Sequence, residues 1–220
     1  RQAREASEYD VLEAEPDSVL SDRSLPGKTR SPAKRKPAPT TKKTAKNPLP
    51  ATLKPQLATL VDSPPEGDWL YEIKFDGYRI LARIDDGEVR LFTRNGHDWT
   101  AKMPRQVAAL KKLKLHCAWL DGEMVVADEN GAADFQALQN AFDSEQDEQI
   151  TYYLFDLLHL DGHDLRQTPV QERRGTLEKL LAKAPDALRY SAAFEQPVAS
   201  LLESACQLNL EGLILSLIHI

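Results

Sequence analysis

The stretch that decides the fold is YEIKFDGYR, at residues 71–79. Within it, Lys74 ends an apolar segment and stands just before Asp76-Gly77, a pair typical of tight turns. We expect this lysine at the end of a strand, held on rigid backbone and pointing out of the sheet. A lysine amine attacks phosphorus only when it is neutral. Desolvation or nearby positive charge must therefore lower the pKa of this lysine from its ordinary value of about 10.4.

Two flanking residues raise the specificity of this stretch. The pattern Lys-x-Asp-Gly alone is expected by chance in about one in twenty chains of this size, and an ordinary hairpin with exposed charges would explain it. Glu72 and Arg79 extend the pattern on either side. Arg79 is also a candidate source of the positive charge that a nucleophilic lysine needs.

The sequence on both sides predicts a mixed order of strands and helices. Strands are expected at 70–74, 80–84, 88–92, 117–127, 151–158 and 211–215, and helices at 103–113, 135–142, 170–182 and 198–208. Antiparallel hairpins with inserted helices predict an α+β fold.

Short turn and cap signals divide these elements. Asp86-Gly87 predicts a hairpin, and Asp121-Gly122 is expected to break the 117–127 region into a pair of strands. Asp134 is expected to cap the helix that follows it, because an aspartate side chain accepts hydrogen bonds from the free N–H groups of a first helical turn.

The charge is unevenly distributed along the chain. The net charge of the 220 residues is −6, but residues 1–50 carry +4 and residues 51–220 carry −10. Residues 21–50 hold nine Lys/Arg, one acidic residue and six prolines, with almost nothing apolar. This composition predicts a disordered basic linker, either a solvated tether or a segment attracted to phosphates. An acidic globular part is not expected to bind nucleic acid unaided.

The cysteines and histidines do not predict a metal site. Cys117 and Cys206 fit no metal or redox spacing and are expected to be small buried apolar residues. His159 and His163 flank an Asp-Gly turn, whereas metal binding by histidines four apart requires a helix. No apolar stretch is long enough to span a membrane, so a cytoplasmic location is expected.

Several short segments of the sequence together resemble a known family. Residues 74–79 match the Lys-x-Asp-Gly-x-Arg signature of covalent nucleotidyltransferases, the superfamily of ATP-dependent ligases and capping enzymes. Further segments resemble the other family motifs in the same order: FTRNG at 92–96, LDGE at 120–123, YYLFD at 152–156 and EGLI at 211–214. Five matches in one order are specific together, although each is short. The resemblance covers roughly 51–214 and implies a nucleotidyltransferase (ATP-grasp-like) fold of antiparallel sheets with flanking helices.

The resemblance implies roles for four residues in the chemistry of phosphate transfer. Lys74 would attack the α-phosphorus of ATP in line and form lysyl-AMP, with release of pyrophosphate. Arg79 and Arg94 would bind phosphate or ribose oxygens through their planar sets of donors. Asp76 would act in the later sealing step.

Five further residues would hold the base and the metal. Glu72 and Ile73 lie on the strand that helps to read the adenine in this family. Phe155 would stack on the adenine, although spacing alone favours a plain core aromatic. Glu123 and Glu211 are hard oxygen ligands suited to Mg²⁺ or Mn²⁺, and exposed turn acids are the alternative.

The resemblance is closer to the DNA ligase D family of bacterial non-homologous end joining. Residues 57–61 and 69–74 resemble the entry to its ligase domain. Residues 8–11 and 16–19 resemble the end of its phosphoesterase module, so residues 1–20 would close that module and 21–50 would be the tether. DNA nicks or double-strand ends are then the expected substrates. The end-binding protein Ku and fused phosphoesterase and polymerase modules are the expected partners.

The sequence departs from the family after Ile214. A ligase is expected to continue into a lysine-bearing motif and an oligonucleotide-binding domain, but no lysine follows Glu211. We therefore expect a truncated ligase adenylation domain at 51–214 with an anomalous tail at 215–220. Such a fragment would bind DNA poorly and take up AMP slowly or not at all. The alternatives are an RNA ligase, a capping-type enzyme that takes GTP, or a non-catalytic DNA- or partner-binding fragment.

Overall fold

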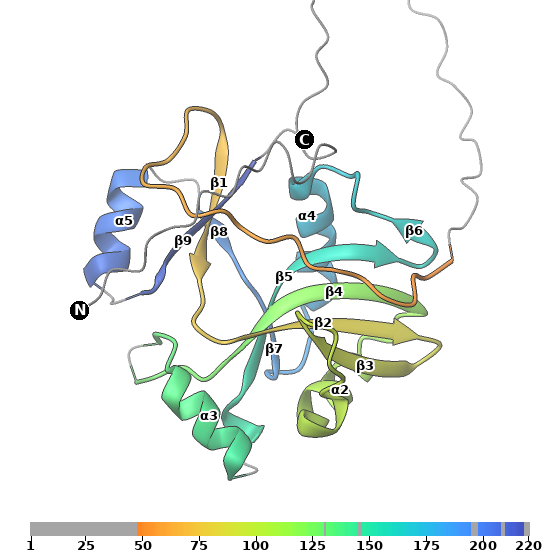
Figure 1. Ribbon diagram of the computed structural model, residues 1–220. Coiled ribbons are helices and arrows are strands. Elements are labelled where there is room, and N and C mark those ends of the chain that lie inside the picture. The colour runs from red at the N-terminus through yellow and green to blue at the C-terminus, as the bar shows by residue number, and fades with distance from the viewer. Residues whose placement is uncertain (1–47, 130, 145–146, 195–197, 208–209, 218–220) are drawn as a thin grey trace, which may run out of the picture. The chain divides into compact units, whose positions relative to one another are not determined.

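The computed structural model describes the folded region in five parts: residues 48–129, 131–144, 147–194, 198–207 and 210–217. The regions expected as the end of a preceding module and as most of the linker lie outside these residues, as does the end of the 215–220 tail. The folded region contains two sheets with helices around them, which confirms the predicted α+β class (Figure 1).

The larger sheet is built around β2, β4 and β5 and is mostly antiparallel. Its strand order is β3-β2-β4-β5-β6, and β7 pairs with β5 in parallel. The strands are β2 (Tyr78–Asp85), β3 (Glu88–Thr93), β4 (Cys117–Val125), β5 (Thr151–Leu160), β6 (His163–Asp164) and β7 (Leu188–Tyr190).

The smaller sheet joins strands from distant parts of the sequence. Its strands are β1 (Trp69–Lys74), β8 (Ala193–Phe194) and β9 (Gly212–Leu217). Their order is β8-β1-β9, and both ladders are antiparallel. The central strand therefore comes from the beginning of the folded region, and its two neighbours come from the end.

The main core lies on one face of the larger sheet. The helices are α2 (Pro104–Lys111), α3 (Phe135–Asp143), α4 (Val170–Leu181) and α5 (Val198–Gln207), with short 3₁₀ turns η2 (Thr100–Lys102) and η3 (Asp147–Gln149). Apolar side chains of β2, β4 and β5 pack with those of α2, α3 and α4 in one buried cluster. Among helices in the described ranges, none combines the length and apolar content that crossing a membrane requires.

A short segment at the start of the folded region covers part of the opposite face. Leu49 and Leu53 pack against a cluster that includes buried Leu81 and Trp119. The Trp119 indole N–H also donates to the carbonyl of Pro50 at 2.9 Å. Leu49 and Pro50, which composition groups with the linker, therefore contact the larger sheet.

Two local predictions are confirmed by the backbone. Asp86 and Gly87 have φ of 47° and 83° and connect β2 to β3 in a tight hairpin, because this turn needs positive φ at both positions. The carboxylate of Asp134 accepts from the N–H of Ala137 at 2.8 Å and caps α3.

The prediction of a break at Asp121-Gly122 is wrong, because β4 continues without interruption through both residues. A Cβ at Gly122 would lie 2.3 Å from the carbonyl oxygen of Tyr153. Glycine is therefore needed for close approach of two strands and not for a turn.

The strands flanking Asp76-Gly77 are present but do not pair with each other. β1 belongs to the smaller sheet and β2 to the larger one, so residues 75–77 carry the chain from one sheet to the other. Gly77 is again a close-approach glycine, because a Cβ there would lie 2.2 Å from the carbonyl oxygen of Met124.

Candidate active site

Lys74 lies at the end of β1, where the smaller sheet meets the larger one. It pairs with Gly212 in the β1–β9 ladder, which brings the preceding residue, Glu211, beside it. The Lys74 ammonium contacts the Glu211 carboxylate, and about two fifths of each side chain is exposed. The candidate nucleophile is thus fixed on a strand, within reach of a carboxylate and of solvent.

The crossing segment brings this strand end against β4 and β5. The ring of Phe75 stacks on that of Tyr153, with centroids 4.5 Å apart. Gly77 lies against β4, and its missing Cβ would be 3.0 Å from Cγ of Glu123. The tight packing at Gly77 therefore sets Glu123 close to the segment that carries Lys74 and Asp76.

Arg79 lies on β2 and is held by a carboxylate of β4. Its guanidinium donates twice to Asp121, from Nε at 3.0 Å and from Nη2 at 2.8 Å. It pairs with Glu123 in the β2–β4 ladder, and its guanidinium carbon lies 5.1 Å from the centroid of the Phe155 ring. Because Asp121 occupies only two of the five N–H donors, the others remain available to a ligand.

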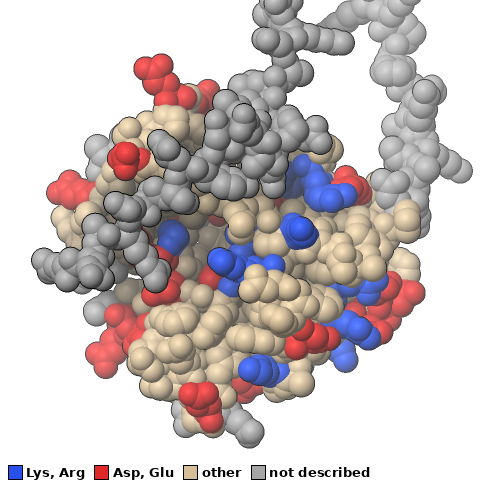
Figure 2. All heavy atoms as spheres, in the orientation of Figure 1, with Lys and Arg blue, Asp and Glu red and all other residues tan. Residues whose placement is uncertain are grey.

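The protonation of Glu123 is strongly altered by its surroundings in the site. Burial raises the pKa of its carboxyl to about 8, while Arg79 and Lys74 lower it and Asp121 and Asp76 raise it. The Glu123 carboxyl therefore interacts electrostatically with both candidate cations and with the neighbouring acids. Figure 2 shows basic and acidic side chains next to one another around a recess in the middle of this face.

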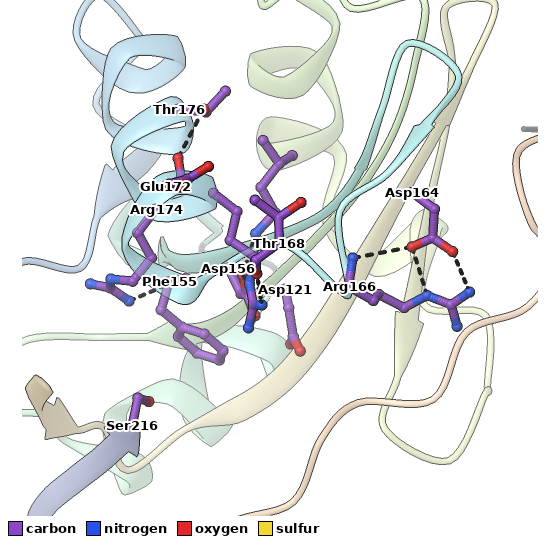
Figure 3. A network of polar contacts seen from close by, with 12 residues as sticks. Asp121, Phe155, Asp156, Asp164, Arg166, Thr168, Glu172, Arg174, Thr176 and Ser216 are labelled. Carbon is purple, nitrogen blue, oxygen red and sulfur yellow. Dashed lines mark hydrogen bonds and ion pairs between the residues drawn. The ribbon is translucent and has the colours of Figure 1, made fainter. Parts of the chain in front are cut away.

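Phe155 occupies a β-bulge. In the β4–β5 register Gly122 faces Leu154 and Asp121 faces Asp156, so Phe155 has no partner within this ladder. Bulges re-aim a side chain, and they are common beside active sites. Phe155 is half-buried and belongs to neither buried cluster, and its ring points away from α4 in Figure 3. The alternative of a plain core aromatic is therefore not supported.

Glu72 is buried and bound to an arginine from α4. Its carboxylate accepts from Nη1 of Arg174 at 2.6 Å and from the Ser216 hydroxyl at 3.4 Å. Burial raises the pKa of Glu72, and Arg174 opposes that rise. The neighbouring Ile73 is half-buried and pairs with Leu213 in the β1–β9 ladder.

Arg94 stands apart from the other candidates. It is exposed just after β3, next to Thr93, which pairs with Ile80 of β2. Among the described residues, no hydrogen bond or ion pair joins it to the rest of the site. It lies near the same end of β2 as Arg79, and only a ligand would connect the two.

Glu123 and Glu211 are the carboxylates that could hold a metal ion. Glu123 lies on β4 and Glu211 immediately precedes β9, and both interact with Lys74. The described residues contain no group of three or more His, Cys, Asp or Glu that could hold a metal by itself. Two carboxylates fit Mg²⁺ binding of the kind that relies on substrate phosphates and water for the remaining positions.

One known protein family matches almost all of the described part of the chain. Residues 48–219 match the family model described as the ATP dependent DNA ligase domain. The chain belongs to that family. This ligase domain is 51% identical to the multifunctional non-homologous end joining protein LigD of Pseudomonas aeruginosa, over 97% of this chain and 26% of that protein. It is also 42% identical to the Mycobacterium tuberculosis LigD over 58% of this chain and 17% of that protein.

Solved structures give the same fold for the ligase domain. The ligase domain of M. tuberculosis LigD has a TM-score of 0.59 and 35% identity, covering 67% of this chain and 48% of that one. A mycobacterial DNA ligase D complexed with ATP and MES matches with the same values. The chain spans about a quarter of the length of the P. aeruginosa relative.

Sequence reasoning missed two site residues of the ligase domain. The Asp-Gly pattern predicts a turn at Asp121, whereas Asp121 lies within β4 and binds Arg79, and the apolar residues on both sides of it are the signal that the sequence offers. Arg174 was included in α4 without a role. A signal was available there too, since Arg174 shares one helical face with Leu177 and Leu181, which are both buried.

Proposed function

We propose that this ligase domain transfers AMP from ATP to Lys74 and then to the 5′-phosphate of DNA. The contact between Lys74 and Glu211 carries the proposal, because it places an amine beside a carboxylate at the junction of the two sheets. A covalent nucleotidyltransferase needs such an amine on rigid backbone, next to groups that bind phosphate and metal.

The first step is an in-line displacement at the α-phosphorus. The Lys74 ammonium must first lose its proton, and water can accept it because about two fifths of the side chain is exposed. The bond from Nζ to phosphorus forms, the bond from phosphorus to the bridging oxygen breaks, and pyrophosphate leaves. Glu123 and Glu211 would hold Mg²⁺ or Mn²⁺, which would neutralise charge on the phosphates.

Other residues bind and orient ATP. The free donors of Arg79 and the exposed guanidinium of Arg94 would take phosphate or ribose oxygens. The Phe155 ring, projected from its bulge, would stack on adenine. Glu72 and Ile73 would form the adjoining edge of the base site, since they lie on the strand that ends at Lys74.

The second step passes AMP to DNA, and the third seals the break. Asp76 is exposed between the two sheets and is our candidate for the sealing step. DNA nicks or double-strand ends are the proposed substrates, with Ku and fused phosphoesterase and polymerase modules as partners, in the cytoplasm. The support is the similarity to end-joining proteins of the LigD type.

Covalent labelling tests the proposal. The chain is incubated for hours with α-labelled ATP and Mg²⁺ or Mn²⁺, alongside the Lys74→Ala variant and a parallel reaction with labelled GTP. We expect label from ATP only that is stable in alkali and lost in acid, as for a bond from nitrogen to phosphorus, its removal by added pyrophosphate, and none on the variant. A folded chain that takes no label, or a Lys74→Ala variant that keeps it, would contradict the proposal. Labelled chain chased with nicked duplex DNA should then transfer the label to the 5′ end.

A further inference from the structure

The two sheets of the site are connected by one buried arginine. In the described residues no strand ladder joins the smaller sheet to the larger one. Arg174 of α4, which is only 2% exposed, reaches both. Its Nη1 donates to the Glu72 carboxylate of β1 and to the Phe155 carbonyl of β5, each at 2.6 Å (Figure 3 shows the second bond).

A third bond fixes the plane of this guanidinium. Nη2 of Arg174 donates at 2.6 Å to the carbonyl of Ser191, in the connection between β7 and β8. The guanidinium carbon also lies 5.2 Å from the centroid of the Tyr190 ring. A planar group with donors in fixed directions can hold three acceptors in one arrangement, and a lysine ammonium cannot reproduce it.

The Phe155 carbonyl is a meaningful partner because Phe155 is the bulge residue. In the β4–β5 ladder Leu154 and Asp156 each have a partner on β4, whereas Phe155 between them has none. A backbone carbonyl left without a partner inside a protein is costly, so the donor that satisfies it also stabilises the bulge. Arg174 is that donor, and the bulge is what projects the Phe155 ring.

We infer that Arg174 is a positioning residue for the AMP transfer proposed above. It holds the strand of Lys74 and the bulge of Phe155 at one spacing, and so aligns the base site with the nucleophile. This inference rests on the proposed function for its catalytic consequence. The structural part of the inference is that the Arg174 side chain holds the two sheets at a fixed spacing. That part does not depend on ATP.

Arg173 provides a matched control. It is the adjacent residue of α4 and also uses three donors, two on the Asp156 carboxylate at 2.7 and 3.1 Å and one on the Thr168 carbonyl at 2.8 Å. These partners lie on β5 and in the segment before α4, so Arg173 makes no bridge to β1. Replacing either arginine removes a similar number of hydrogen bonds. Only replacement of Arg174 should remove the connection between the two sheets.

Hydrogen exchange in the absence of ATP tests the bridge directly. We compare Arg174→Lys, Arg173→Lys and the double variant Glu72→Gln/Arg174→Met, which keeps no buried unpaired charge and so guards against misfolding. Amides of 70–74 and 153–157 should both exchange about tenfold or more faster in the two Arg174 variants. Arg173→Lys should affect only 153–157. Unchanged exchange at 70–74 in both Arg174 variants would overturn the inference.

Single-turnover labelling then tests the catalytic consequence. Arg174→Lys should raise the ATP concentration for half-maximal rate and lower the maximal rate by about 10- to 100-fold, because small misplacements of a nucleophile have effects of this size. Its preference for ATP over GTP should narrow, while Arg173→Lys should keep the wild-type preference. Equal kinetics in the two lysine variants would reject the positioning role. Failure of the proposed function is distinguishable, since the wild-type chain itself would then take no label.

Discussion

Lys74 touches the carboxylate of Glu211, 137 residues later in the chain, because Lys74 and Gly212 are partners in the β1–β9 ladder. The register of the β1–β9 ladder therefore determines the contact between Lys74 and Glu211, and a shift of that register by one residue would move Glu211 away from the amine. Both side chains are substantially exposed, so their attraction contributes little to folding.

Replacement of Glu211 should separate function from stability. In Glu211→Gln we expect the free energy of unfolding to change by no more than about 1 kcal/mol, as for other exposed ion pairs. The rate of lysyl-AMP formation should fall by about 10²-fold or more, because a metal ligand beside the nucleophile is lost. Chemical denaturation and labelling measure the two effects. Loss of stability with an unchanged labelling rate would show that Glu211 is structural.

Removal of Arg79 should destabilise the fold as well as the site. Asp121 is 2% exposed and would be left as a buried charge in Arg79→Met, so we expect a loss of about 3 kcal/mol. This value is at the low end for buried pairs because the Arg79 side chain is 23% exposed. The exposed pair Arg90–Glu88 gives the control, and Arg90→Met should leave the urea midpoint unchanged. Equal midpoints for the two variants would contradict this account of Asp121.

The raised pKa of Glu123 predicts a pH-dependent stability. The carboxyl titrates near 4.5 when unperturbed and at about 8 in the folded protein, so the folded state retains a proton that the unfolded state has lost. Its contribution is fully present below about 4.5 and is lost as the pH rises through about 8. Burial also raises the pKa values of Glu72 and Asp121, so the informative quantity is the difference from Glu123→Gln. The wild-type melting temperature should fall more steeply across this range, and parallel curves would refute the assignment.

The crossing segment should not tolerate a side chain at Gly77. Gly77→Ala would force a Cβ against the Met124 carbonyl, and overpacking of this kind destabilises by about 1–3 kcal/mol. It should also slow AMP transfer, because the shift moves Lys74 relative to Glu123. Gly175→Ala is the matched control, since its Cβ would meet nothing within 4 Å and α4 would gain about 0.5–1 kcal/mol. A harmless Gly77→Ala would mean that the two segments are free to separate.

Local patterns predicted the elements well, because each depends on neighbouring residues. The Asp86-Gly87 turn and the Asp134 cap are encoded within four residues, and the structure contains both. The same rule failed at Asp121-Gly122, where the glycine is explained by a strand about thirty residues away. A turn glycine and a close-approach glycine look identical in a single sequence.

The site shows the same limit more clearly. Motif resemblance named Lys74, Glu123 and Phe155, but no pattern showed that Phe155 stands at a bulge. Bulges depend on the register between two strands, which a single strand does not encode. The link between Glu72 and Arg174 spans 102 residues and arises only because α4 packs on β5 and β7 with Arg174 reaching β1.

The order of strands in the smaller sheet has a consequence for synthesis of the protein. β1 leaves the ribosome first, whereas β8 and β9, its two neighbours, follow more than a hundred residues later. At about 5–20 residues per second, β1 waits roughly ten seconds with both edges open. During that time the apolar strand that carries Lys74 is a template for pairing with another chain. A chaperone that covers β1 during this interval should therefore raise the yield of folded protein.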